Sequence, residues 1–151
     1  MTDEFLMEEV PALLRKLNED REPLWGSMNA LQMVDHVYNA FVLSQNKTHW
    51  AVRAPEDKLE AAKHFLHSEK PLPRNVPLPE GFVKAPVEPS ANLKEASERL
   101  LNEIPSFLKA IDQPNYVAYH PDFGKMNAKD ILILMRKHTR HHFAQFGLIE
   151  R

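Results

Sequence analysis

Two histidines near the end of the chain have the spacing of residues that share a ligand. His138 and His142 lie four residues apart in the stretch 126–148, MNAKDILILMRKHTRHHFAQFGL. Positions i and i+4 of an α-helix differ by only about 40° around its axis, so both imidazoles can reach one ligand in front of the helix. Gln145 falls within about 20° of His138 on the same reckoning. A buried helix face that carries two histidines and a glutamine indicates a binding site.

The stretch 126–148 has the signals of a helix at both ends. Asn127 is placed to cap its start with Asp130 three residues later, and Gly147 stands where a helix ends. The inward-facing stripe at helical spacing consists of Ile131, Leu134, Met135, His138, His142 and Phe146. The two histidines therefore lie in the middle of the face that is expected to be buried.

A second histidine-bearing helix is predicted over residues 29–46, with Asn29 as its cap. Its inward stripe contains Gln32, Met33, His36, Ala40 and Leu43. The segment WGSMNA before this helix resembles FGKMNA before the last one, since each has an aromatic residue, a glycine, a methionine and an asparagine cap. His36 and His138 follow their caps by separations that return to nearly the same helix face, within about 20°. His36 is therefore the candidate for a third ligand.

Three histidines from two helix faces would form a neutral set of three nitrogens for a divalent metal. Imidazole suits zinc, nickel, iron or copper better than magnesium or calcium, and a site without a fourth protein ligand keeps a position for water or substrate. The residues expected to orient the ligands or to line the pocket are Gln32, Asp35, Asn39, His141 and Gln145. H-x-x-x-H pairs also occur on helices that bind no metal, and such histidines are satisfied by neighbouring polar groups. Burial of three polar rings without a shared partner is costly, which favours the metal.

The other histidines are expected to have different roles. His64 and His67 point away from the apolar stripe of their predicted helix, so we expect both to be solvated. His49 lies in a loop without an identifiable partner. His120 could hydrogen-bond its own loop or reach a fourth coordination position on the metal, and we favour the loop role.

The rest of the chain is also predicted to be helical. Further helices are expected over residues 3–17, over 55–69, and from a cap at Ser90 or Asn92 to about Ile111, followed by a loop over 112–125. Pro11 should kink or restart the first of these helices, Pro105 should bend the last, and Glu95 is placed as the capping-box partner of Asn92. Six prolines within residues 70–89 favour an extended crossover. Because no stretch alternates convincingly with period two, the predicted fold class is all-α, in a single domain spanning residues 1–151.

The composition is that of an ordinary soluble globular protein. The chain has 151 residues, of which 43% are hydrophobic and 26% are charged, and this length is sufficient for one domain with a core. A formal net charge of −2 gives no electrostatic reason to expect nucleic acid or a membrane as a partner. No run is long enough to span a bilayer and the acidic start is unlike a signal segment, so we expect a cytoplasmic protein. The absence of cysteine excludes disulfides, thiolate ligands and a cysteine nucleophile.

Three longer motifs resemble the DinB-like (DinB/YfiT-like) superfamily, in a branch catalogued as a domain of unknown function. They are LWGSMNALQMVDH near the start, HPDFGKMN before the last helix, and KHTRHHFAQF within it. The resemblance covers most of the chain and implies a four-helix bundle with one long crossover, often as a homodimer. It also implies a divalent metal held by one histidine of an early helix and by an H-x-x-x-H pair of the last helix. On this sequence these residues are His36, His138 and His142, which the helix periodicity selects independently.

The resemblance implies two kinds of reaction. Some members of the superfamily are thiol-dependent S-transferases, in which the metal activates the thiolate of a low-molecular-weight cofactor, and others are called metal-dependent hydrolases by analogy. The sequence shows no distinct general base, which slightly favours thiol transfer because the cosubstrate supplies the nucleophile. We therefore expect a metal-dependent enzyme for a small-molecule substrate, with zinc or nickel favoured. The alternative is a non-catalytic bundle with a structural metal or a protein-interaction role, in which protein ligands close the site and metal removal unfolds the chain.

Overall fold

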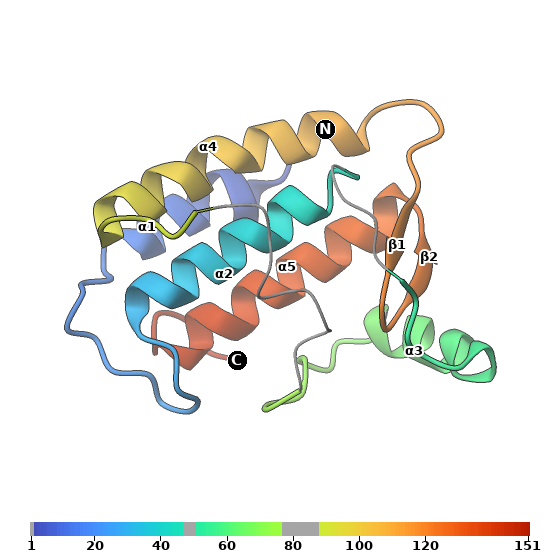
Figure 1. Ribbon diagram of the computed structural model, residues 1–151, viewed down its shortest axis with the longest axis horizontal. Coiled ribbons are helices and arrows are strands. Elements are labelled where there is room, and N and C mark those ends of the chain that lie inside the picture. The colour runs from blue at the N-terminus through green and yellow to red at the C-terminus, as the bar shows by residue number, and fades with distance from the viewer. Residues whose placement is uncertain (1, 47–50, 77–87) are drawn as a thin grey trace.

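Helices dominate the fold of this protein (Figure 1). The computed structural model describes residues 2–46, 51–76 and 88–151. Its elements are η1 (Phe5–Glu9), α1 (Val10–Leu14), α2 (Ala30–Leu43), η2 (Glu56–Lys58), α3 (Leu59–Leu66), α4 (Leu93–Ile111), β1 (Ala118–His120), β2 (Gly124–Met126) and α5 (Ala128–Gln145). Of these, η1 is π-helical and η2 is a 3₁₀ turn. The prediction of a mainly helical protein is confirmed, and none of the described helices is long and apolar enough to cross a membrane.

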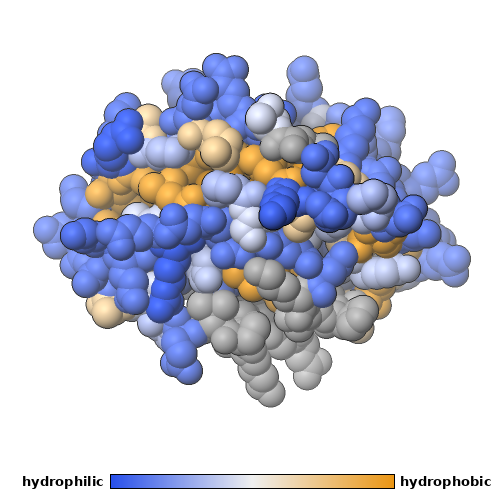
Figure 2. Space-filling model, turned by 90° about the horizontal axis from the view of Figure 1, so that it is seen from above, coloured by the Kyte–Doolittle hydropathy of each residue, from blue (hydrophilic) through white to orange (hydrophobic). Residues whose placement is uncertain are grey.

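Helix α2 lies at the centre of the core, because it packs against both α4 and α5 (Figure 1). Phe41 of α2 and Phe107 of α4 are fully buried, and their rings meet edge to face with centroids 5.1 Å apart. Other fully buried side chains around them are Leu6, Met33, Leu100, Ile104, Phe143 and Phe146. Hydrophilic residues cover most of the face shown in Figure 2. The packed core fixes the position of α2, and therefore of His36, relative to α5.

The two histidine-bearing helices begin in the same way. The side chain of Asn29 accepts a hydrogen bond from the Gln32 backbone N–H, and the side-chain oxygen of Gln32 accepts one from the Asn29 backbone N–H. Asn127 and Asp130 form the same reciprocal pair at the start of α5. The predicted caps are therefore confirmed, and each pair satisfies two backbone N–H groups that a helix start leaves unpaired.

The other helices differ in detail from the predicted ones. The first helix changes from π-helical to α-helical geometry one residue before Pro11 and ends at Leu14. Pro11 has no backbone N–H to donate to the preceding turn, and the change of helix type lies next to it. The third helix begins with a 3₁₀ turn, so its α-helical part starts only at Leu59. Helix α4 continues through Pro105, which is exposed.

A short β-hairpin replaces the predicted loop before the last helix. Strands β1 and β2 pair antiparallel, with Tyr119 opposite Lys125, and the hairpin lies beside α3 (Figure 1). Gly124 has a φ of 70°, and a Cβ atom there would lie 3.0 Å from the side chain of Leu59. The expectation of no strand was therefore wrong here, because strands of three residues are too short to show a period of two.

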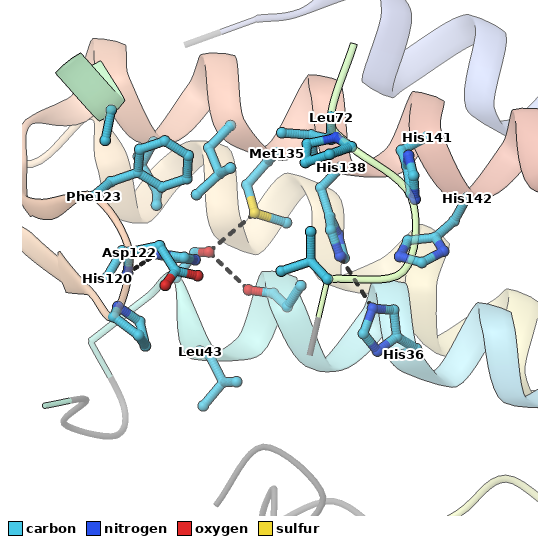
Figure 3. A pocket seen from close by; sticks show the side chains of 18 of the residues that line it. His36, Leu43, Leu72, His120, Asp122, Phe123, Met135, His138, His141 and His142 are labelled. Atoms are coloured by element: carbon cyan, nitrogen blue, oxygen red, sulfur yellow. Dashed lines mark hydrogen bonds between the residues drawn. The ribbon is translucent and has the colours of Figure 1, made fainter. Parts of the chain in front are cut away.

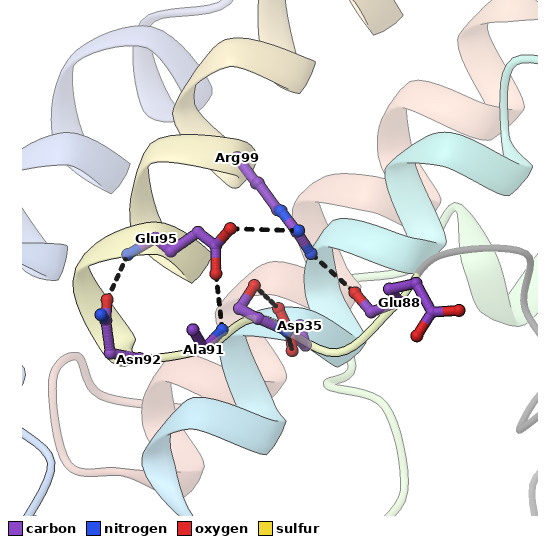
Figure 4. A network of polar contacts seen from close by, with 7 residues as sticks. Asp35, Glu88, Ala91, Asn92, Glu95 and Arg99 are labelled. Atoms are coloured by element: carbon purple, nitrogen blue, oxygen red, sulfur yellow. Dashed lines mark hydrogen bonds and ion pairs between the residues drawn. The ribbon is translucent and has the colours of Figure 1, made fainter.

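Polar contacts join α2 to the chain that precedes α4 (Figure 4). Asp35 accepts hydrogen bonds from the backbone and the hydroxyl of Ser90, at 2.8 and 2.6 Å. Asn92 caps α4 as predicted, but the carboxylate of Glu95 accepts from the backbone of Ala91 rather than from that of Asn92. Residues 77–87 of the proline-rich crossover lie outside the described residues, and its described parts contain no helix or strand.

Candidate metal centre

Three imidazole rings from two helices meet at one wall of a cavity (Figure 3). His36 extends from α2, and His138 and His142 extend from successive turns of α5. One nitrogen of each ring lies within 4.8 Å of the corresponding nitrogens of the other two. The Nε2 atoms of His36 and His138 are 3.1 Å apart. The structure thus brings together the three histidines that the sequence selects.

The nitrogen spacing fits a single divalent ion. Two imidazole nitrogens on one tetrahedral zinc are about 3.4 Å apart, given Zn–N distances of about 2.0–2.1 Å. The distance of 3.1 Å between Nε2 of His36 and Nε2 of His138 is slightly shorter than this value. The upper limit of 4.8 Å on the nitrogen–nitrogen distances among the three histidines is somewhat longer. Side-chain shifts of about 1 Å would therefore centre an ion between the three rings.

Gln145 fixes the orientation of His142. Its Nε2 donates to the carbonyl oxygen of Trp25 at 3.0 Å, which leaves its Oε1 facing Nδ1 of His142 at 2.8 Å. Because a carbonyl oxygen only accepts, the proton of neutral His142 lies on Nδ1 and its Nε2 presents a lone pair. Metal-binding histidines typically donate their second N–H to such an acceptor. The sequence placed Gln145 next to His138, whereas its hydrogen bond is to His142.

The close approach of Gln145 requires a glycine at position 26. Gly26 has a φ of 81°, a conformation that residues with a Cβ atom rarely adopt. A Cβ atom at this position would lie only 2.5 Å from Nε2 of Gln145. The glycine of the WGSMNA segment therefore gives Gln145 access to the Trp25 carbonyl.

All three histidines are neutral at pH 7. Desolvation by burial, reinforced by neighbouring histidines, lowers the pKa of His36 to about 4 and that of His142 to about 3. Burial lowers the pKa of His138 well below its ordinary value, and the other histidines lower it further. Neutral imidazoles retain the lone pairs that a metal ion requires.

The other predicted site residues have different positions. His141 is buried, lines the cavity and meets the ring of Trp25 edge-on at 5.6 Å, as expected for a residue at the pocket. Gln32 is exposed and forms the α2 capping box, so it does not serve the pocket. Asn39 is not among the described residues that line the cavity. Asp35 was expected to orient a ligand, and it binds Ser90 instead.

Two buried nitrogens near the site have no hydrogen-bond partner among the described residues. These are Nδ1 of His138 and Nδ1 of His141. His138 therefore lacks the kind of support that Gln145 gives to His142. Gln145 therefore supports one of the three rings, that of His142.

The cavity beside the three histidines has a volume of about 740 Å³. Its described wall is mainly apolar and includes Met28, Ala40, Leu43, Phe65, Leu134 and Met135. Arg53 and Asp122 also line it and form a two-point ion pair, with N–O distances of 2.6 and 2.9 Å. Trp25 and Phe123 line the cavity as well, and both are the aromatic residue of a repeated segment. The repeat of WGSMNA and FGKMNA in the sequence could have identified these two aromatic residues as part of the cavity.

The remaining histidines are separate from the three-histidine cluster. Nδ1 of His120 accepts a hydrogen bond from the Asp122 backbone at 3.0 Å, which matches the loop role that the sequence favours. His64 is exposed, as predicted. His67 is also exposed, as predicted, and its Nε2 in addition lies 2.8 Å from a carboxylate oxygen of Asp130. His49 lies outside the described residues.

Comparisons of this chain with protein-family models, with curated proteins and with solved structures found no match. The chemistry of the site must therefore be inferred from its own residues.

Replacing Gln145 with methionine is expected to lower the affinity for zinc or nickel by about 10- to 100-fold, the effect typical of losing the partner of a metal-binding histidine. Methionine preserves length but cannot accept the proton of His142 Nδ1. Calorimetric titration with zinc measures the change. Gln113→Met, at an exposed site, is the matched control. Equal affinities for wild type and Gln145→Met would show that Gln145 does not support the site.

Proposed function

We propose that this protein is a divalent-metal-dependent enzyme that binds its metal through His36, His138 and His142. The observation that carries the proposal is the convergence of three neutral imidazoles on the wall of a large, mainly apolar cavity. Active sites are commonly cavities of this kind with a few convergent polar groups. The proposal includes a four-helix bundle of the DinB-like type, consistent with the packing of α2 against α4 and α5.

The incomplete ligand set supports a catalytic rather than a structural site. A structural zinc site is closed by four protein ligands, whereas a catalytic site keeps an open position. In the described part of the chain, the only group of metal-binding side chains around this centre is the three histidines. His120, the candidate for closing the site, bonds its own loop instead. An open position facing the cavity would be available to a substrate.

Zinc or nickel is the proposed metal, because three neutral imidazoles match the preference of these borderline ions. When bound, such an ion would supply Lewis acidity, which lowers the pKa of a coordinated thiol or water and polarises a carbonyl. His142, held by Gln145, would present a fixed lone pair to the ion.

Thiol transfer is the reaction we propose first. Asp35 is bonded to Ser90 and Asp122 to Arg53, so neither carboxylate is available as a general base next to the histidines. Hydrolysis benefits from such a base to activate water, whereas a low-molecular-weight thiol brings its own nucleophile. In the proposed step the thiolate sulfur attacks an electrophilic carbon, the carbon–leaving-group bond breaks, and the thiol proton passes to solvent.

The reaction is tested with zinc- and nickel-loaded protein, L-cysteine as the thiol and monochlorobimane as a fluorogenic electrophile. We expect the rate of chloride displacement to exceed that of the metal-free protein and of the His138→Ala variant. An ester screen with the same preparations tests hydrolysis. If the metal-loaded protein accelerates ester cleavage but not the thiol reaction, the proposal of thiol transfer is wrong and hydrolysis is the reaction.

The metal-free protein is expected to lose stability as the pH falls below about 6.5. In the unfolded chain His36 and His142 titrate near 6.5, whereas in the folded protein their pKa values are about 4 and about 3. Between these values the unfolded chain takes up protons that the folded protein excludes. The free energy of unfolding should therefore fall by about 1.4 kcal/mol per pH unit for each such histidine.

Urea denaturation at pH 7 and at pH 5 measures this pH dependence. His36→Phe removes one of the buried groups and should weaken the dependence, while His64→Ala, at an exposed position, should leave it unchanged. If the wild type, His36→Phe and His64→Ala lose the same unfolding free energy between pH 7 and pH 5, His36 does not cause the pH dependence.

A further inference from the structure

The cavity has two polar ends with an apolar middle (Figure 3). His36 and His138 mark one end. From there the cavity follows α2 to Leu43 and Ser44, and it follows α5 back to Met135, whose sulfur is 3.2 Å from the Ser44 hydroxyl. The rise of 1.5 Å per residue makes the distance from His36 to Ser44 along α2 about 12 Å. The hairpin residues His120, Asp122 and Phe123 lie at the other end.

His120 presents a hydrogen-bond donor at this second end. A backbone N–H can only donate, so the contact of Asp122 N–H with Nδ1 of His120 requires a lone pair on Nδ1. Burial lowers the pKa of His120 to about 4, so the ring is neutral at pH 7 and its proton lies on Nε2. Within the described residues, Nε2 of His120 has no hydrogen-bond partner. A ligand in the cavity would give this N–H an acceptor.

The charge at the second end is already balanced. The guanidinium of Arg53 forms a two-point ion pair with Asp122, so the nearest cation is neutralised by a carboxylate. A neutral donor beside a neutralised ion pair favours a neutral acceptor, such as a ketone, ester or amide oxygen, over a free carboxylate. Between the two ends, the walls formed by Ala40, Leu43 and Leu134 offer only apolar contacts.

We propose that the cavity binds an elongated, apolar small molecule that carries a metal-binding group at one end and a neutral carbonyl group at the other, and that the carbonyl accepts a hydrogen bond from Nε2 of His120. This proposal rests on the proposed metal site. It defines the substrate class by length and by the chemistry of the two ends, and it makes His120 a specificity-determining residue.

The test uses zinc-loaded protein and a series of hydroxamic acids, in which the hydroxamate binds the metal. Acetohydroxamic acid reports on the metal site alone. Longer linear hydroxamic acids, each made with either a terminal methyl ketone or a methylene in place of the ketone carbonyl, report on the cavity. We expect affinity to rise with chain length, and the ketone of optimal length to bind roughly 2- to 13-fold more tightly than its methylene analogue, as one additional hydrogen bond provides.

His120→Asn is the matched variant. The side-chain oxygen of asparagine can accept the Asp122 N–H two residues later, as Nδ1 of His120 does, so the turn is preserved. Asparagine is too short to present a donor at the position of Nε2. In this variant the ketone and methylene probes should bind equally, with the affinity for acetohydroxamic acid unchanged. Leu43→Trp should weaken the long probes but not acetohydroxamic acid, because it fills the middle of the cavity.

The outcomes separate the two proposals. If acetohydroxamic acid does not bind, the metal site is absent and both proposals are overturned. If it binds but longer chains gain no affinity, or if the ketone keeps its advantage in His120→Asn, the metal site stands and the substrate class is wrong. Unchanged binding of the long probes to Leu43→Trp would also overturn the proposed substrate class. Leu43 belongs to α2, so this variant tests the cavity without a change in the hairpin that carries His120.

Discussion

Replacing His138 with alanine is expected to lower the affinity for zinc or nickel by more than 100-fold. Loss of an outer partner of a metal ligand typically costs 10- to 100-fold, and loss of the ligand itself costs more. His138 is the histidine whose Nε2 lies 3.1 Å from that of His36, and its ring centroid is 4.6 Å from that of His142. The remaining two nitrogens would leave the ion with half of its tetrahedral positions filled by protein. Competition with a chromophoric chelator at pH 7 measures the affinity.

The His138→Ala experiment has a natural control. His64→Ala removes an exposed histidine of α3 and should bind metal like the wild type, because His64 is outside the three-histidine cluster. Circular dichroism of the metal-free proteins establishes that each variant retains its helices. A folded His138→Ala variant with wild-type affinity would exclude His138 as a ligand.

Replacing Phe107 with alanine is expected to cost about 3–5 kcal/mol of unfolding free energy, the usual range for removing a fully buried phenylalanine. Phe107 is fully buried in α4, and its ring packs edge to face against Phe41 of α2. The lost contacts hold α2 in place, and α2 carries His36. We therefore expect zinc affinity to fall together with stability, although Phe107 is not a cavity residue.

Urea denaturation of the metal-free protein measures the effect of Phe107→Ala. Phe65→Ala is the comparison, because Phe65 is only partly buried at the edge of the cavity and its loss should cost less. A cost below about 1 kcal/mol for Phe107→Ala would mean that the packing of α2 on α4 does not determine the stability of the fold.

Local patterns were sufficient to predict the parts of the structure that depend on neighbours in sequence. The spacing of His138 and His142 placed both on one face because helix geometry alone determines it. The asparagine caps at positions 29 and 127 were predictable because the capping partner is three residues away. The repeated segments before α2 and α5 then related His36 to His138 across more than 100 residues of chain.

Contacts between distant segments were not predictable in the same way. Polar side chains have several suitable partners, and periodicity does not say which one lies nearby. Asp35 was expected to orient a metal ligand but binds Ser90, 55 residues later. His67 is exposed as predicted, but its contact with Asp130, 63 residues later, was not predicted. Gln145 was correctly placed at the site, yet its hydrogen bond to His142 depends on the Trp25 carbonyl that orients its amide.

The most direct test of the metal centre is elemental mass spectrometry on untagged protein. We predict a near-stoichiometric amount of zinc or nickel in the wild type, and its loss from a variant in which His36 is replaced with alanine. The three neutral imidazoles that converge at the cavity wall are the reason for this prediction. Protein that contains no transition metal, and that takes up neither zinc nor nickel nor iron when these are added, would contradict it.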